Sequence, residues 1–256
     1  MAHWVRFEKD GEAGFGTLDA EVITVHRGDM FSGATATGGR VSLGEVRLLT
    51  PCVPSKMICL WNNFRALAAK LAAPIPTAPL YLLKPTTSFI GSGEAVRRPP
   101  SYSGKIVFEG ELGIVIGERL SDANEAEAAT GIFGYTCVND ITAADIINAD
   151  PSFPQWARAK GFDTFGAFGP AIATGLDVAG ASIRTVLNGT ERQNYPVADM
   201  IFPPARLVSL LSADMTLLPG DVIACGTSVG VGVMKEPGNV VEVSIDGIGT
   251  LSNTLA

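Results

Sequence analysis

Histidine is almost absent from this sequence, which contains only His3 and His26, both near the N-terminus. Catalytic zinc sites and Ser-His-Asp triads depend on histidine as a ligand or as a general base. The scarcity therefore argues against a histidine-rich zinc site and against a catalytic triad. The four cysteines form no Cys-x-x-Cys pair, so we interpret them as buried thiols in a reducing, cytoplasmic compartment.

Clusters of basic residues and long apolar runs are also missing. The formal net charge is −7 and no run of lysine and arginine occurs, whereas binding to phosphate backbones needs such clusters. No apolar run approaches the roughly 18 residues that a membrane-spanning helix requires. The first residues, MAHWVRFEKD, lack the basic-then-apolar layout of a signal peptide. We expect neither nucleic acid nor a membrane as a partner.

The sequence does contain many short, strand-like runs separated by glycine and proline. Apolar residues make up 46% of the chain, which is enough for a substantial core. Many short strands with few helices indicate an α+β, β-rich fold, a mixed β-sandwich or roll rather than a doubly wound sheet. We expect a small N-terminal β subdomain over residues 1–52 and a larger domain over residues 53–256.

Only a few segments are typical of helices. The alanine and leucine content predicts a helix within residues 62–73, and a polar start predicts another within residues 121–130. Proline in a first turn is compatible with a third helix over residues 203–212. The dipeptide at 188–189, Asn-Gly, predicts a hairpin with a type I′ turn. Residues 155–170, QWARAKGFDTFGAFGP, are predicted to be mostly loop.

Residues 105–117, KIVFEGELGIVIG, carry the most informative pattern. Valine and isoleucine predominate, which predicts a strand, and side chains alternate between the two faces of a strand. Glu109 and Glu111 then share one face with Val107 and Val115. The opposite face is wholly apolar and consists of Ile106, Phe108, Leu112, Ile114 and Ile116.

Two neighbouring carboxylates on such a strand have two explanations. Buried anions cost several kcal/mol each unless they are paired or bind a metal, and oxygen ligands suit magnesium, calcium or manganese. Alternatively, Glu109 and Glu111 both face water or pair with arginine or lysine, since glutamate is seldom fully buried.

Several segments, taken together, resemble the fumarylacetoacetate hydrolase family. These are YLLKPTTSFIGSG, FEGELGIVIG, GYTCVNDITAADI, KGFDTFGAFGP, VADMIFPPARLVSLLSADMTLLPGDVIACGTSVGVG and VEVSIDGIGTL. They keep the order of the family and cover the chain from about residue 56 to its end. Each segment alone is weak, but the six in register are specific, and they imply the β-rich fold of that family.

The resemblance implies a metal site. In that family a Glu-x-Glu pair and an aspartate on a neighbouring strand hold a divalent cation. The matching residues are Glu109, Glu111 and Asp140, which implies that Mg²⁺, or else Mn²⁺ or Ca²⁺, is bound. Three carboxylates supply part of the oxygen shell and leave positions for water and a chelating substrate.

The resemblance also implies roles for five further residues. Lys160 and Asp163 match a Lys-x-Phe-Asp element and are expected to be catalytic, with the lysine neutralising developing negative charge. Thr227, preceded by Gly226, matches a residue that meets the substrate carboxylate. Lys84 matches a Lys-Pro element and is expected to line the pocket wall. The family further implies a homodimer.

One segment departs from the family pattern. Family hydrolases and decarboxylases carry Asn-Tyr-x-x-His-x-x-Glu on a lid, where the histidine and glutamate activate water. Here Leu67 replaces the histidine, Lys70 replaces the glutamate, and Asn62 stands where the family has arginine. The water-activating pair is therefore absent.

Three functions remain open. The resemblance favours metal-dependent C–C hydrolysis of a small 2,4-diketo, acylpyruvate-type acid of aromatic catabolism. The missing lid pair instead favours metal-assisted tautomerisation, isomerisation or decarboxylation of a 2-oxo acid or a 2-hydroxymuconate-type diacid. The third function is non-catalytic binding of a metal and a diacid, because a shared fold does not guarantee activity. In each case the partner is a small 2-oxo or enol carboxylate.

Overall fold

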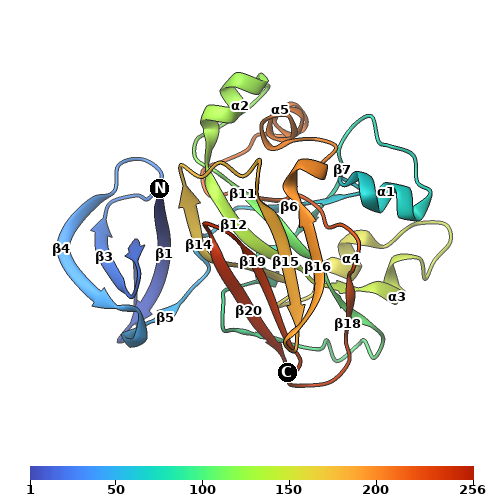
Figure 1. The fold of residues 1–256 in the computed structure, drawn as a ribbon, viewed down its shortest axis with the longest axis horizontal. Helices are drawn as coiled ribbons and strands as arrows, with labels where there is room; N and C mark the ends of the chain where they lie inside the picture. The colour runs from blue at the N-terminus through green and yellow to red at the C-terminus, as the bar shows by residue number, and fades with distance from the viewer.

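The computed structural model describes residues 1–256, and its first strands form a meander at one end of a large sheet (Figure 1). These strands are β1 (Ala2–Lys9), β2 (Glu12–Asp19), β3 (Val22–Arg27), β4 (Thr35–Ser42) and the short β5 (Arg47–Leu48). Val5, Phe7 and Ile23 of the meander are buried together with Ala171 from the rest of the chain. The N-terminal segment therefore has a small separate core that it shares with β14.

The meander continues into the rest of the sheet because β1 pairs antiparallel with β14 (Gly166–Thr174). The sheet has 12 strands, most of them in the order β4-β3-β2-β1-β14-β12-β11-β17-β6-β7. Its remaining members are β12 (Ile132–Asp140), β11 (Gly110–Ile116), β17 (Val222–Ala224), β6 (Met57–Trp61), β7 (Leu80–Lys84) and β8 (Phe89–Ile90). Every residue of β11 is buried, which explains its nearly continuous apolar sequence.

A second sheet of five strands packs against the central part of the first (Figure 1). It consists of β16 (Thr190–Pro196), β15 (Ser182–Leu187), β19 (Val240–Ile245), β20 (Gly249–Leu255) and β9 (Ala95–Val96). A third, small sheet contains β13 (Thr142–Ala143), β10 (Ile106–Phe108) and β18 (Gly232–Met234). A cluster of 41 buried residues fills the space between the layers, so the predicted β-rich sandwich is confirmed.

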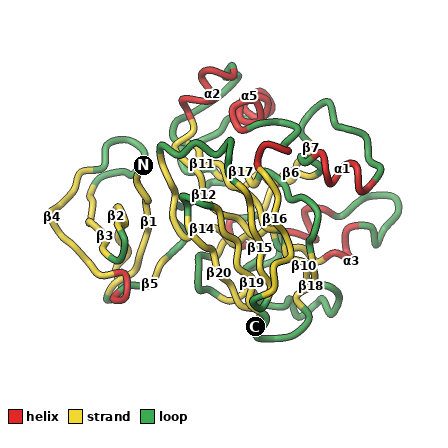
Figure 2. The backbone as a smooth tube through the Cα atoms, in the orientation of Figure 1, coloured by secondary structure: helices red, strands yellow, loops and turns green.

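The helices are short and lie around the margin of the strands (Figure 2). They are α1 (Arg65–Leu71), α2 (Glu125–Gly131), α3 (Ala144–Ile147), α4 (Trp156–Lys160) and α5 (Pro204–Asp214), with 3-10 turns at Leu43–Glu45, Thr86–Ser88 and Val197–Asp199. The Asn124 side chain and Glu127 form a capping box at the start of α2. No helix combines the length and the apolar character that crossing a bilayer would require.

The strand predicted over residues 105–117 is interrupted at Glu109. It forms β10 and β11, which belong to different sheets, and at the break the Glu109 N–H donates to the Asn139 side-chain oxygen at 3.1 Å rather than to a backbone carbonyl. The predicted division of faces is nevertheless confirmed within β11. Leu112 and Ile114 enter the large core, whereas Val115 enters a separate cluster on the other face.

The prediction of loop for residues 155–170 is wrong. This segment contains α4 and the first half of β14, which pairs with β12 on one side and with β1 and β8 on the other. Its glycines and alanines are typical of turns, but here they allow close packing. A Cβ at Gly166 would lie 2.8 Å from the Ser88 hydroxyl oxygen. By contrast, the type I′ hairpin is confirmed, since Asn188 and Gly189 have φ of 50° and 76°.

Candidate metal and substrate site

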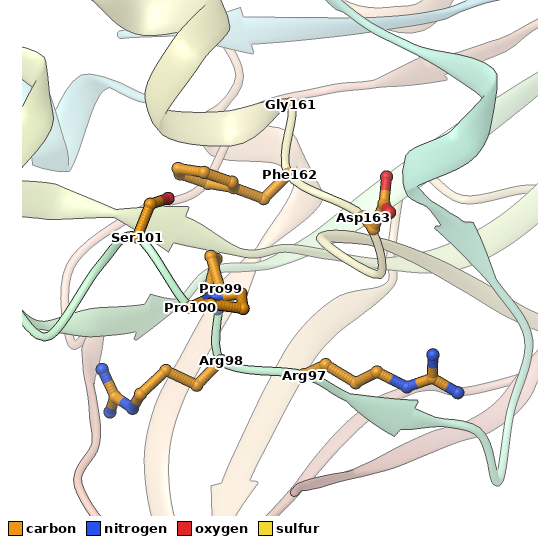
Figure 3. A pocket seen from close by; sticks show the side chains of 8 residues that line it. All are labelled: Arg97, Arg98, Pro99, Pro100, Ser101, Gly161, Phe162 and Asp163. Atoms are coloured by element: carbon orange, nitrogen blue, oxygen red, sulfur yellow. The ribbon is translucent and has the colours of Figure 1, made fainter.

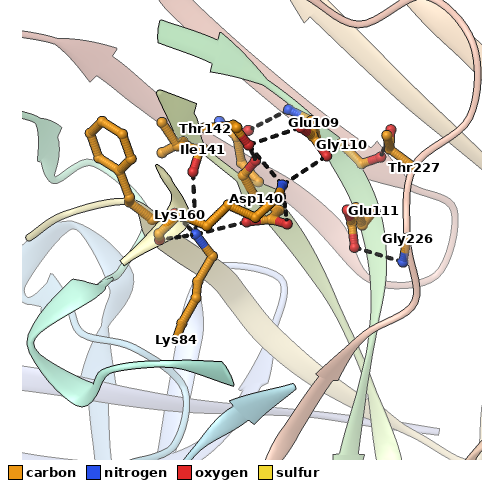
Figure 4. Close-up of polar contacts among 12 residues, drawn as sticks. Lys84, Glu109, Gly110, Glu111, Asp140, Ile141, Thr142, Lys160, Gly226 and Thr227 are labelled. Atoms are coloured by element: carbon orange, nitrogen blue, oxygen red, sulfur yellow. Dashed lines mark hydrogen bonds and ion pairs between the residues drawn. The ribbon is translucent and has the colours of Figure 1, made fainter. Parts of the chain in front are cut away.

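Three acidic side chains converge where β10, β11 and β12 meet (Figure 4). Glu109 lies between β10 and β11, Glu111 is the second residue of β11, and Asp140 ends β12. The antiparallel register sets Gly110 opposite Asn139, which brings Asp140 beside Glu109. One carboxylate oxygen from each of the three lies within 4.8 Å of the others. The structure therefore brings the three predicted metal ligands together.

Two buried lysines accompany the carboxylates. Lys160 Nζ, at the end of α4, lies 2.6 Å from Asp140 Oδ2, 2.7 Å from Thr142 Oγ1 and 3.1 Å from Glu109 Oε2. Lys84 Nζ, at the end of β7, lies 2.7 Å from Asp140 Oδ1 and donates to backbone carbonyls, including that of Phe165 at 2.9 Å.

The alternative explanation of paired or solvated glutamates therefore applies only in part. Glu109 does pair with Lys160 and keeps 19% of its side chain exposed. Glu111 is fully buried and forms no ion pair within 4 Å. Its Oε2 accepts the Gly226 N–H at 2.8 Å, while its Oε1 is buried with no hydrogen-bond partner.

Burial and neighbouring charges have opposite effects on the pKa of Lys160 and Asp140, but they act in the same direction on Glu111. Burial lowers the pKa of Lys160, but Asp140, Glu109 and Glu111 raise it more, so the ammonium stays charged. Burial raises the pKa of Asp140, but Lys160 and Lys84 more than reverse this and hold that pKa below its ordinary value. Burial, followed by repulsion from Asp140 and Glu109, raises the pKa of Glu111 well above its ordinary value.

The cluster fits a hard divalent cation. Its donors are carboxylate oxygens, which magnesium, calcium and manganese prefer. When all three carboxyl groups are ionised, they face two ammonium groups, and one negative charge is left without a partner. The orphaned Oε1 of Glu111 carries part of that charge, and a buried polar atom without a partner is costly. A cation held by Glu109, Glu111 and Asp140 would neutralise the unpaired negative charge and would also give Oε1 of Glu111 a partner.

Gly226 and Thr227, predicted to bind substrate, adjoin the cluster. The Gly226 N–H is already used by Glu111. The Thr227 hydroxyl donates to the Gly110 carbonyl at 3.1 Å and accepts from Gln193 Nε2 at 2.9 Å. The Thr227 backbone N–H has no acceptor within the protein. Its amide, rather than its hydroxyl, is therefore the group that is open to a ligand.

Asp163 is not brought to the cluster. Its side chain is exposed and lines a pocket of about 460 Å³ with Arg97, Arg98 and Phe162 (Figure 3). It forms no ion pair, and it is not among the acidic groups that converge. The catalytic role implied for Asp163 stays a prediction that no contact supports.

Comparison of the sequence with known proteins identifies the family to which the chain belongs. Residues 56–256 match the family model described as fumarylacetoacetate (FAA) hydrolase C-terminal, and residues 2–51 match the model described as Rv2993c-like, N-terminal. The chain belongs to the fumarylacetoacetate hydrolase family.

Relatives within the family carry different names. Protein Rv2993c of Mycobacterium tuberculosis is 42% identical over 248 residues, which are 95% of this chain and 91% of that protein. Oxaloacetate tautomerase YisK of Bacillus subtilis is 36% identical, over 84% of this chain and 74% of that one. The structure of a 2-hydroxyhepta-2,4-diene-1,7-dioate isomerase from Mycobacterium marinum superposes with a TM-score of 0.91 at 36% identity, covering 100% and 98% of the chains.

The lid positions of the family lie on α1, and here they carry no acid–base pair. Leu67 is half-buried against the large core and Lys70 is exposed. Asn62, just before the helix, is buried and donates to the Pro74 carbonyl at 3.1 Å. Neither histidine replaces the missing base, since His3 binds the Gly247 carbonyl and His26 contacts Trp4 edge to face in the N-terminal meander.

Four polar residues around the cluster were not predicted from the sequence as site residues. Thr142 and Asn139 bind Glu109 and flank Asp140, so proximity in sequence could have indicated them. Gln193 and Tyr195 come from β16 in the other sheet and bind Gly110. No pattern in the hairpin sequence distinguishes these two from its exposed polar residues.

Proposed function

We propose that this chain is a Mg²⁺- or Mn²⁺-dependent enzyme that interconverts the keto and enol forms of a small, oxaloacetate-type 2-oxo dicarboxylate. One observation carries the proposal. A charged lysine lies among three convergent carboxylates, while the lid offers no base that could activate water. Movement of a proton from carbon to oxygen needs charge stabilisation at the 2-oxo oxygen but no water nucleophile.

The positive charge of Lys160 is the protein group that would stabilise negative charge on the substrate. When bound, a divalent cation would polarise the 2-oxo group as a Lewis acid. The Lys160 ammonium is held by Asp140, Glu109 and Thr142, so it is oriented before substrate arrives. It would stabilise the negative charge on the substrate oxygen while the carbon-bound proton passes to a solvent water on the exposed side of Glu109 and water returns a proton to that oxygen. Because its pKa is raised, Lys160 stays an ammonium and acts through its positive charge and not as the base, while Asp140, Glu109 and Thr142 accept its three N–H groups.

The loop after β17 offers a place for the substrate carboxylate. The Thr227 N–H has no acceptor within the protein, and the neighbouring Ser228 hydroxyl is buried without a partner. Buried donors of this kind bind a carboxylate favourably because they would otherwise lack an acceptor. We therefore assign the carboxylate next to the 2-oxo group to this loop.

C–C hydrolysis of an acylpyruvate is the competing reaction. It requires an activated water, and Leu67 and Lys70 do not provide the acid–base pair for it. The names of two relatives, an oxaloacetate tautomerase and a dienedioate isomerase, also support proton transfer. We expect hydrolysis to be the slower of the two reactions.

A turnover panel tests the proposal. Purified enzyme with Mg²⁺ or Mn²⁺ is given oxaloacetate, with the enol followed by its ultraviolet absorbance, and separately acetylpyruvate and a 2-hydroxymuconate. We expect tautomerisation that EDTA abolishes. Faster cleavage of acetylpyruvate than tautomerisation would overturn the assignment, and binding of Mn²⁺ without turnover of any substrate would favour a binding protein.

Restoring the lid pair separates the two reactions further. The double variant Leu67→His with Lys70→Glu should raise acetylpyruvate hydrolysis while leaving tautomerisation within about threefold, because only hydrolysis uses an activated water. An equal change in both rates would show that the lid residues do not decide which reaction occurs.

A further inference from the structure

The peptide group of Gly110 joins the two glutamates of the cluster, and on one side no strand pairs with it. β17 pairs with β11 only further along the strand, so the side of β11 away from β12 is open at Gly110. The Gly110 N–H instead donates to Gln193 Oε1 at 3.1 Å. The Gly110 carbonyl accepts from the Thr227 hydroxyl at 3.1 Å and also from the Tyr195 hydroxyl. Side chains therefore take the place of the missing strand.

Gln193 uses both ends of its amide in this arrangement. Its side chain belongs to a residue that is 2% exposed, and its Oε1 accepts the Gly110 N–H. Its Nε2 donates to Thr227 Oγ1 at 2.9 Å and to the Ser228 carbonyl at 3.4 Å. One side chain from the second sheet thus connects the strand that carries the glutamates with the loop that follows β17. The Thr227 hydroxyl, which donates to the Gly110 carbonyl, and the Glu111 carboxylate, which accepts the Gly226 N–H, link the same two parts directly.

The packing at Gly110 shows that the second sheet lies directly against this peptide. A Cβ built at Gly110 would fall 2.0 Å from the hydroxyl oxygen of Thr185, the residue that pairs with Gln193 in the hairpin. Only glycine fits between the glutamates, and the peptide has little freedom to rotate. A contact that orients this peptide also orients the side chains of Glu109 and Glu111 on either side of it.

We propose that Gln193 is a positioning residue that fixes Glu109 and Glu111 for the cation and couples them to the loop of Thr227. The inference rests on the proposed function, because it takes these glutamates as cation ligands. Residues that orient metal ligands typically change metal affinity by about 10- to 100-fold when they are lost. Since Gln193 also holds Thr227, its loss affects both the cation and the substrate.

The test is isothermal titration of Mn²⁺ into the metal-free full-length chain and its variants. Gln193→Met keeps the length of the side chain and removes both hydrogen-bonding ends. We expect Mn²⁺ to bind about 10- to 100-fold more weakly and KM for oxaloacetate to rise. The matched control is Asn253→Leu, which removes a buried amide bound to the Gly91 and Glu94 carbonyls, both at 2.9 Å, in the same sheet.

The control separates positioning from general stability. Asn253→Leu should lower the thermal midpoint by a similar amount yet leave Mn²⁺ affinity within about twofold. If Gln193→Met does not fold, Tyr195→Phe, which removes one hydroxyl donor to Gly110, should still weaken Mn²⁺ binding about threefold or more.

The outcomes distinguish this inference from the proposed function. Wild-type Mn²⁺ affinity in folded Gln193→Met, or an equal loss in Asn253→Leu, would overturn the positioning role and leave the metal site intact. Failure of the wild-type chain to bind Mn²⁺ would overturn both.

Discussion

Replacing Lys160 by methionine probes the charge balance of the site most directly. The Lys160 side chain is 4% exposed, and its ammonium lies 2.6 Å from Asp140 and 3.1 Å from Glu109. Removing one partner of a buried ion pair costs about 3–5 kcal/mol, because the remaining charge is buried without compensation. For a chain of this size each kcal/mol lowers the thermal midpoint by about 2–4 °C, so we expect a loss of about 6–20 °C in EDTA.

A divalent cation should reverse much of this loss. Binding at 100 times the dissociation constant stabilises a protein by about 2.7 kcal/mol, or about 5–11 °C at the same scale. The variant should gain at least as much from Mn²⁺ as the wild type does, because the cation replaces the missing positive charge beside Asp140 and Glu109. Turnover should nevertheless fall about 10²- to 10³-fold, as for other preorganised donors to a developing charge.

The assay is thermal unfolding followed by circular dichroism, in EDTA and in excess Mn²⁺, with turnover measured in parallel. Arg184→Met is the control, because Arg184 forms an ion pair with Glu191 at 2.6 Å that is about half exposed. Exposed pairs contribute about 1 kcal/mol at most. If the two variants have the same midpoint in EDTA, the buried cluster does not carry the charge imbalance that we infer.

Three further outcomes are expected. Glu111→Gln should abolish detectable Mn²⁺ binding in titration calorimetry without unfolding the chain, and wild-type affinity would remove this residue from the site. Gly110→Ala should destabilise by about 1–3 kcal/mol through overpacking, measured by urea unfolding, and Thr185→Ala added to it should recover part of the loss, because the new Cβ would lie 2.0 Å from that hydroxyl. Burial raises the pKa of the Cys52 and Cys137 thiols from 9.0 to about 12. Each thiol therefore adds stability that is complete below pH 9 and is lost as the pH rises toward 12, by up to about 1.4 kcal/mol per pH unit. Urea unfolding at pH 8 to 10 should show a flatter pH dependence when both cysteines are alanine, and an unchanged slope would contradict this.

Local patterns predicted those parts of the fold that local chemistry determines. The Asn-Gly turn requires positive φ at two positions, and few residue pairs other than Asn188-Gly189 allow this so readily. Apolar alternation gave the correct faces of β11 because one face had to meet the large core. The break at Glu109 was not predictable in this way, since it depends on Asn139, 30 residues further along the chain.

Contacts between segments that are distant in sequence determine the structure where local patterns gave no correct prediction. The small residues of β14 are typical of a loop, yet they form a strand because β12, β1 and β8 pair with its backbone, and a Cβ at Gly166 would lie only 2.8 Å from the Ser88 hydroxyl oxygen. No local sequence pattern indicated Gln193, because the group that it binds, the Gly110 N–H, lies more than 80 residues away in sequence. For Asp163 the family resemblance pointed to the site, but its exposed side chain faces a different pocket.

The charge arrangement also suggests an order in which ligands enter. With Glu109, Glu111 and Asp140 all ionised, the cluster carries one excess negative charge, which attracts a divalent ion and repels a dicarboxylate. Glu109 is the only one of the three acids with part of its side chain exposed, so the cluster opens to solvent on its side. A bound divalent cation would leave one excess positive charge in the same buried space. If the proposed function holds, the site would then attract the dicarboxylate, and we expect the cation to bind first and the substrate second.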